Sequence, residues 1–222
     1  MRFKSLAVAS IVLSVAVLAA QEPPLGTEDE RMLYTLGMAL SRRLNEYALT
    51  PAEAELVRRG LMDGLLGKKE AVDFAAEAER MDDYFGERVR KIAERQRSAG
   101  EVFRERKGKQ RGAVTTGTGL VFLDVEEGDG ARPTGADTVR VKLTGTLPGG
   151  EVFLGETEDP VELALALPCV REGLLRMKTG GRAQLVCPPE LAYGNRGVPP
   201  HVLPGDTVVY EVELLAIDKA TP

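Results

Sequence analysis

The chain has 222 residues, with 43% apolar side chains, 28% charged side chains and a formal net charge of -5. This length fits one or two domains, and the mild acidity gives no reason to expect that the whole chain binds nucleic acid. The sequence holds one histidine, His201, and two cysteines, Cys169 and Cys187. So few soft ligands nearly exclude a zinc or haem site, and we expect no metal and no cofactor.

The first 20 residues have the pattern of a secretory signal peptide. Arg2 and Lys4 precede an uncharged run from Leu6 to Ala20 that ends in small residues. An uncleaved membrane anchor is the alternative, but a span needs about 20 apolar residues and this run is shorter. We therefore expect an exported protein, periplasmic or secreted, with no stable membrane insertion after cleavage.

Export changes the interpretation of the two cysteines. An oxidising compartment permits a disulfide between Cys169 and Cys187. The alternative is a pair of buried free thiols, which behave as small hydrophobic side chains. Composition leaves both possibilities open.

Residues 27 to about 110 have helical spacing. Thr27 with Glu30 and Thr50 with Glu53 match capping boxes, and a third, longer helix is predicted to begin near Glu70. Three amphipathic helices form a thin core for a monomer, so a dimer that shares their apolar faces would bury more surface. The sequence predicts an all-α dimerisation domain with a long linker helix.

The end of this helical segment is strongly basic. Residues 88–111 contain ten Lys or Arg and three Asp or Glu. An arm that binds nucleic acid or an anionic membrane is one interpretation. A solvated linker helix is the other, and we favour it because an exported protein meets little nucleic acid. We expect no nucleic-acid partner.

From Ala113 onward the hydrophobic period changes to two. The pattern predicts strands at 119–125, 138–143, 161–165, 182–187 and 207–217, and a short helix near 169–177. An antiparallel sheet wrapped on one short helix is an α+β fold. The expected domains are therefore residues 27–112, helical, and residues 113–222, α+β.

The second half contains five recognisable segments, at residues 139–147, 150–153, 171–181, 188–194 and 207–215. Taken together, these segments resemble the FK506-binding-protein domain, the FKBP-type peptidyl-prolyl cis-trans isomerase family. The helical half, including residues 60–69, resembles the dimerisation region of the macrophage-infectivity-potentiator type of FKBP. The resemblance implies a homodimer that assists folding of unfolded or proline-containing polypeptides in the cell envelope.

The resemblance also implies a prolyl pocket. Phe153 stands at the family's pocket phenylalanine, and Tyr193 stands at the tyrosine whose hydroxyl donates to a bound carbonyl. These two residues are the expected catalytic pair. Further positions implied to line the pocket are Leu167, Val202 and Tyr210.

Four further positions of the implied pocket depart from the family's pattern. Leu143 replaces a tyrosine, Leu154 an aspartate, Val161 an aromatic residue and Val170 the tryptophan of the pocket floor. We expect an apolar groove that still accepts proline-containing peptide, with reduced turnover. The alternative is a chaperone or binding module whose isomerase site has degenerated.

Overall fold

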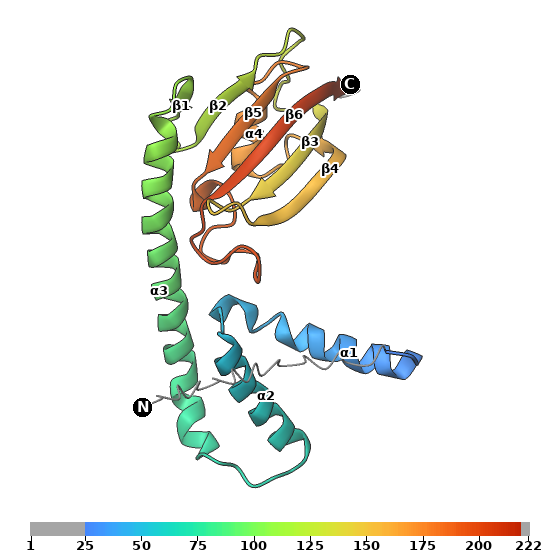
Figure 1. Ribbon diagram of the computed structural model, residues 1–222, viewed down its shortest axis with the longest axis vertical. Helices are drawn as coiled ribbons and strands as arrows, with labels where there is room; N and C mark the ends of the chain where they lie inside the picture. The colour runs from blue at the N-terminus through green and yellow to red at the C-terminus, as the bar shows by residue number, and fades with distance from the viewer. Residues whose placement is uncertain (1–24, 219–222) are drawn as a thin grey trace, which may run out of the picture. The chain divides into compact units, whose positions relative to one another are not determined.

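The computed structural model describes residues 25–218 (Figure 1). These residues divide into two units, 25–38 and 39–218. The predicted signal peptide, residues 1–20, lies outside the described residues. Within 25–218 no helix combines the length and the apolar character needed to cross a membrane.

The N-terminal half contains three α-helices, as the spacing predicted. They are α1 Glu28–Ser41, α2 Pro51–Leu65 and α3 Phe74–Gly108, with a short 3-10 helix at Asn45–Tyr47. Both predicted capping boxes form, because the first-turn glutamate of α1 and of α2 accepts from the backbone N–H of the threonine before it. α3 begins at Phe74 rather than near Glu70, because Asp73 caps it by accepting from Ala76 N at 3.2 Å.

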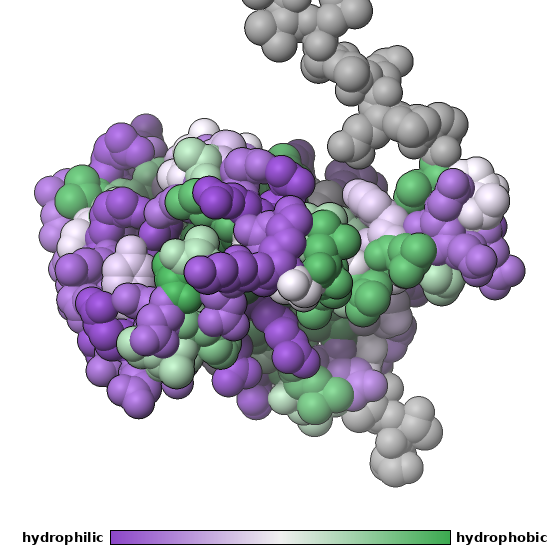
Figure 2. All heavy atoms as spheres, turned by 90° about the horizontal axis from the view of Figure 1, so that it is seen from below, coloured by the Kyte–Doolittle hydropathy of each residue, from purple (hydrophilic) through white to green (hydrophobic). Residues whose placement is uncertain are grey.

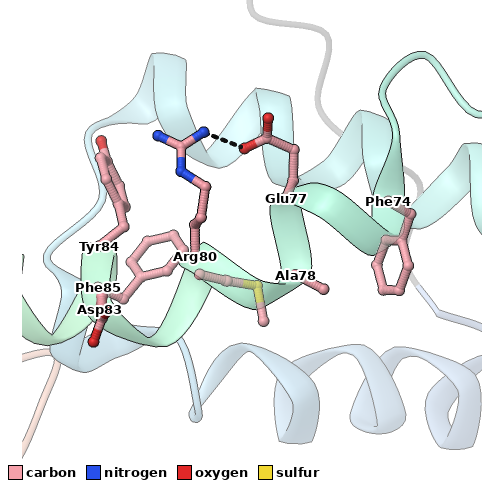
Figure 3. A pocket seen from close by; sticks show the side chains of 8 residues that line it. Phe74, Glu77, Ala78, Arg80, Asp83, Tyr84 and Phe85 are labelled. Carbon is pink, nitrogen blue, oxygen red and sulfur yellow. Dashed lines mark hydrogen bonds and ion pairs between the residues drawn. The ribbon is translucent and has the colours of Figure 1, made fainter.

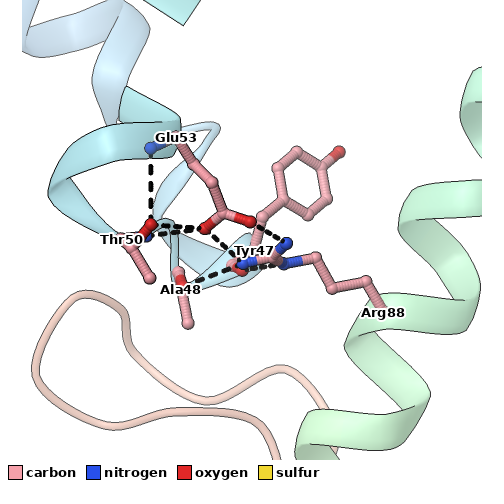
Figure 4. Close-up of polar contacts among 5 residues, drawn as sticks. All are labelled: Tyr47, Ala48, Thr50, Glu53 and Arg88. Carbon is pink, nitrogen blue, oxygen red and sulfur yellow. Dashed lines mark hydrogen bonds and ion pairs between the residues drawn. The ribbon is translucent and has the colours of Figure 1, made fainter. Parts of the chain in front are cut away.

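One ion pair joins the start of α2 to α3 (Figure 4). The guanidinium of Arg88 donates to both carboxylate oxygens of Glu53, at 2.7 and 2.9 Å, and to the backbone oxygens of Tyr47 and Ala48. Glu53 also accepts from Thr50 N at 2.8 Å. The hydrogen bonds from Arg88 and Thr50 lower the pKa of Glu53 from 4.5 to about 2.

The helices α1 and α2 bury no side chain in the described chain. Their apolar faces are exposed instead, and Figure 2 shows hydrophobic residues in patches among hydrophilic ones. The exposed apolar side chains of these helices include Leu33, Leu36, Leu56, Leu61 and Leu65. This thin core is what the helical spacing predicted.

The C-terminal half is a six-stranded sheet in the order β1-β2-β5-β6-β3-β4, with antiparallel neighbours throughout. The strands are β1 Ala113–Thr115, β2 Val121–Glu126, β3 Thr138–Thr146, β4 Val152–Glu162, β5 Arg182–Cys187 and β6 Val208–Asp218. The short helix α4, Pro168–Leu174, packs against the sheet. The predicted α+β fold is therefore confirmed.

Alternation along β6 separates two apolar clusters. Val208, Tyr210, Val212 and Leu214 share the main core with α4, as their period-two spacing predicted. Val209 belongs to a second cluster that includes Phe103 of α3. Side chains from α3 therefore cover part of the other face of the sheet.

Strand β4 differs from the sequence-based prediction. The predicted strand at 161–165 is wrong beyond Glu162, where β4 ends and a turn follows. Most of β4 was missed because it is an edge strand, paired only with β3 and largely exposed, so its sequence lacks clean alternation. Pro160 lies within this strand, and an edge strand tolerates proline.

The second half of α3 differs from a solvated linker. Ile92, Ala93 and Gly100 are buried there, although basic residues surround them in the sequence. The helix ends at Gly108, and β1 begins at Ala113. Long basic side chains keep their charges in solvent while the small and apolar residues between them pack.

Candidate functional site

Three aromatic rings meet on the α4 side of the sheet. Phe153 comes from β4, Tyr193 follows the 3-10 helix Pro189–Leu191, and Tyr210 comes from β6. The ring of Phe153 lies edge-on to the rings of Tyr193 and Tyr210, with centroids 6.0 and 5.7 Å apart. Gly145 of β3 leaves room for Phe153, since a Cβ there would lie 2.5 Å from Phe153 Cζ.

The hydroxyl groups of Tyr193 and Tyr210 are hydrogen-bonded, with their oxygens 2.9 Å apart. Tyr210 is only 1% exposed, whereas Tyr193 is half-buried. Burial and the hydrogen bond to Tyr193 raise the pKa of Tyr210, so its hydroxyl stays protonated. A buried hydroxyl needs an acceptor, so the favoured arrangement has Tyr210 donating to Tyr193. The proton of Tyr193 is then available for a ligand.

The other predicted pocket residues belong to the same apolar core or pack against it. Val170 and Val202 are buried in it. The remaining ones are half-buried, namely Leu143, Leu154, Val161 and Leu167. The fold thus brings all nine predicted pocket residues to one core, and those on its exposed margin remain accessible.

The disulfide lies within this core. Cys169 in α4 is bonded to Cys187 at the end of β5, with Cα atoms 5.8 Å apart. The sequence had left this pairing open against free thiols. Val170 follows Cys169 in α4, so the crosslink fixes the helix that supplies the predicted floor of the pocket.

The comparisons with known proteins decide the family. Residues 130–215 match the family described as FKBP-type peptidyl-prolyl cis-trans isomerase, and residues 29–123 match the domain amino terminal to it. FkpA of Escherichia coli K12, an FKBP-type peptidyl-prolyl cis-trans isomerase, is 33% identical, over 92% of this chain and 82% of FkpA. The chain belongs to the FKBP-type peptidyl-prolyl cis-trans isomerase family.

Other members of this family are similar over nearly their whole length. The FKBP-type 22 kDa isomerase of Escherichia coli K12 is 34% identical, over 88% of this chain and 98% of the relative. The outer membrane protein MIP of Legionella longbeachae is 26% identical over 99% of each chain. The crystal structure of FkpA from Escherichia coli matches with a TM-score of 0.63 and 30% identity, over 89% of this chain and 100% of that one.

The candidate site of this FKBP-type chain consists of apolar side chains and phenol hydroxyls. No group of three or more His, Cys, Asp or Glu suited to a metal ion occurs among residues 25–218. Sequence reasoning missed the pairing of Tyr193 with Tyr210. The signal was present, because the alternation along β6 predicted that Tyr210 faces the core, where its hydroxyl needs a partner.

A separate apolar surface lies on the first turns of α3. An open cavity of about 660 Å³ lies there, lined in part by Phe74, Met81, Tyr84 and Phe85. Figure 3 shows the side chains of Phe74, Tyr84 and Phe85 around it. Glu77 and Arg80 beside it are paired with each other. None of the residues that line this cavity is a predicted prolyl-site residue. The cavity adds to the exposed apolar surface of the helices.

Proposed function

We propose that this chain is a peptidyl-prolyl cis-trans isomerase that assists the folding of exported proteins. The observation that carries this proposal is the edge-on contact of Phe153 with Tyr193, beside the buried Tyr210. Together these rings present an apolar wall and one hydroxyl donor. Membership of the FKBP-type family supports the same activity.

The reaction needs no charged catalytic group. Rotation about an X-Pro bond is opposed by amide resonance, with a barrier of about 18–20 kcal/mol. Apolar side chains around Phe153 would remove water from the imide and receive the prolyl ring. The Tyr193 hydroxyl would donate to a substrate carbonyl and favour the twisted bond.

Turnover is proposed to be reduced in this chain. Leu154 and Val170 are apolar where the family resemblance implies an aspartate and a tryptophan. Val170 is 5% exposed, so it offers the prolyl ring little surface compared with an indole. Leu143, in place of a tyrosine, removes a further polar group from the site.

A proline-limited refolding assay tests the activity. The full chain at micromolar concentration should accelerate the slow phase of an unfolded client, and the variant Tyr193→Phe should accelerate it less. An exposed tyrosine on the helices, Tyr34, supplies the matched control Tyr34→Phe, which should behave like the wild type. Absence of any acceleration by the wild type would contradict the isomerase proposal.

A binding module without isomerase activity is the alternative function, and the apolar replacements Leu143, Leu154 and Val170 favour it. These side chains would hold an extended apolar peptide without stabilising the twisted bond. Suppression of client aggregation with no change in the proline-limited phase would select this alternative.

We further propose that the chain is exported and forms a homodimer through its helices. The pattern of residues 1–20 supports export, and a similar protein from Legionella longbeachae is named an outer membrane protein. The exposed apolar faces of α1 and α2 support dimerisation, because isolated helices with such faces gain stability by burying them.

A further inference from the structure

The loop of residues 194–206 starts directly after Tyr193 and is closed at its base, where Gly205 N donates to Gly194 O at 2.9 Å. Inside the loop, Val198 and Val202 exchange two backbone hydrogen bonds of 2.8 and 3.1 Å. The side chain of Val202 is fully buried in the core that holds Tyr210. The position of this loop therefore determines one wall of the prolyl site.

Helix α3 contacts the far end of this loop closely. The side chain of Gln96 donates to Asp206 Oδ1 at 2.7 Å, while Leu203 N donates to Asp206 Oδ2 at 2.6 Å. Asp206 is only 6% exposed, so these are desolvated polar contacts. Gly205 lies against the backbone of the helix, where a Cβ would be 2.4 Å from Ala93 O.

One and two turns further on, at Gly100 and Arg104, the helix again approaches the end of the loop. Arg104 Nη1 donates to the buried Thr207 Oγ1 at 2.7 Å. Gly100 packs on the same threonine, and a Cβ at Gly100 would lie 2.2 Å from Thr207 Oγ1. Because a methyl group cannot occupy that space, the close approach of helix and loop depends on this glycine.

The same helix also contacts the beginning of the loop. The guanidinium of Arg97 lies 3.4 Å from Glu190 Oε1 and donates to the side chain of Asn195. Glu190 precedes Tyr193 in the chain and Asn195 follows it. Arg97 therefore spans the segment that carries the proposed hydroxyl donor.

We propose that residues 92–104 of α3 act as a brace that positions Tyr193 and the loop 194–206 for the isomerase reaction. The proposal rests on the isomerase function proposed above, and it assigns the positioning of the prolyl site in part to helix α3. Gln96, Arg97, Gly100 and Arg104 are positioning residues, because none of them belongs to the core that would receive the prolyl ring. Displacing the helix would shift the loop and the hydroxyl together.

Two glycines in one helix give a matched test in the full chain. Gly86 has no neighbouring atom within 4 Å of an added Cβ, whereas Gly100 is in close contact. Both substitutions by alanine favour the helix itself. Gly100→Ala should lower kcat/KM by about tenfold relative to Gly86→Ala, mainly through a higher KM, because misplacement of a site wall weakens substrate positioning.

Hydrogen exchange supplies a second measurement that does not require activity. Gly100→Ala should accelerate exchange of the Val202 and Gly205 amides, and Gly86→Ala should not. If the wild type is active and both variants match it in kcat/KM and in exchange, the brace is overturned. If the wild type is inactive but Gly100→Ala accelerates exchange at these amides, the brace stands and the isomerase proposal falls.

A surface variant guards against a general folding defect in Gly100→Ala. Arg97→Ala removes the contacts to Glu190 and Asn195, and should lower kcat/KM by about threefold, as expected for loss of partly exposed polar contacts. Arg90→Ala is its control, because Arg90 pairs with Glu87 on the same helix. Equal kcat/KM for these two variants would contradict a positioning role for Arg97.

Discussion

The hydroxyl oxygens of Tyr193 and Tyr210 lie 2.9 Å apart, and Tyr210 is the more deeply buried of the two. The two phenol hydroxyls therefore differ in the hydrogen-bond partners available to them. Tyr193 can turn to solvent or to a ligand for a replacement partner, whereas the Tyr210 hydroxyl depends on Tyr193. The pair therefore links the stability of the core to the proposed donor of the prolyl site.

Removing either hydroxyl should have different consequences. Tyr193→Phe should destabilise the fold by about 1–3 kcal/mol, since it leaves the Tyr210 hydroxyl buried without its partner. It should also lower kcat/KM about fivefold, which corresponds to a neutral hydrogen bond of about 1 kcal/mol. Tyr210→Phe removes the buried hydroxyl itself, and the remaining Tyr193 hydroxyl can bind solvent. This variant should therefore lose less stability. Urea unfolding of both variants measures which one loses more free energy of unfolding. A larger loss for Tyr210→Phe would contradict this prediction.

The disulfide should contribute measurable stability. Cys169 and Cys187 are separated by 18 positions, and a loop of that length gives about 3 kcal/mol in the chain-entropy model. The double variant Cys169→Ala/Cys187→Ala should lose about that amount in urea unfolding. Reductant should destabilise the wild type and leave the double variant unchanged. Two titratable thiols in the oxidised wild type would show that the bond is absent.

Dimerisation should depend on the exposed helix faces. Leu33 of α1 is 70% exposed and Leu61 of α2 is 47% exposed. Leu33→Asp and Leu61→Asp should each shift the sedimentation mass toward that of one chain, because a buried unpaired carboxylate opposes association. Leu165→Asp is the control, since Leu165 is 80% exposed but lies in the turn after β4. A dimer that persists in both helix variants would place the interface elsewhere.

Acid should weaken the link between α2 and α3. The pKa of Glu53 is lowered from 4.5 to about 2 by Arg88 and Thr50, so its contribution to stability is full above 4.5 and is lost as pH falls toward 2. Wild-type helix stability, followed by circular dichroism during urea unfolding, should fall across this range. Glu53→Gln should be less stable than the wild type near neutral pH, and its stability should not show this fall between pH 4.5 and 2.

A neighbouring glutamate controls for the acid prediction. Glu55 pairs with Arg58 within α2, and this pair lowers its pKa without connecting two helices. Glu55→Gln should therefore keep most of the wild-type stability near neutral pH. If Glu53→Gln and Glu55→Gln behave alike, the contact between Glu53 and Arg88 does not stabilise the packing of these helices.

Local patterns predicted the regular elements of the fold well. The capping boxes at Thr27 and Thr50 and the alternation along β6 each depend on residues close in the sequence. The edge strand β4 was missed because both its faces are largely exposed, so burial imposes no period on its residues. Its recognition depends on pairing with β3, which is a non-local property.

The candidate site was predictable as a set of residues but not as a geometry. Phe153, Tyr193 and Tyr210 come from separate elements, and only the folded chain shows their rings in contact. The alternation along β6 predicted that Tyr210 is buried, but the hydrogen bond also depends on the approach of Tyr193 from a separate segment, which local spacing does not specify. The packing of α3 was hidden for a similar reason, because many charges surround the small residues Ala93 and Gly100.

The position of Phe103 has a practical consequence for dissecting this protein. Phe103 covers Val121, Val186 and Val209 on the sheet face opposite α4. A fragment cut between α3 and β1 would uncover these valines and invite self-association. A fusion of the sheet domain to another protein should therefore keep about the last four turns of α3.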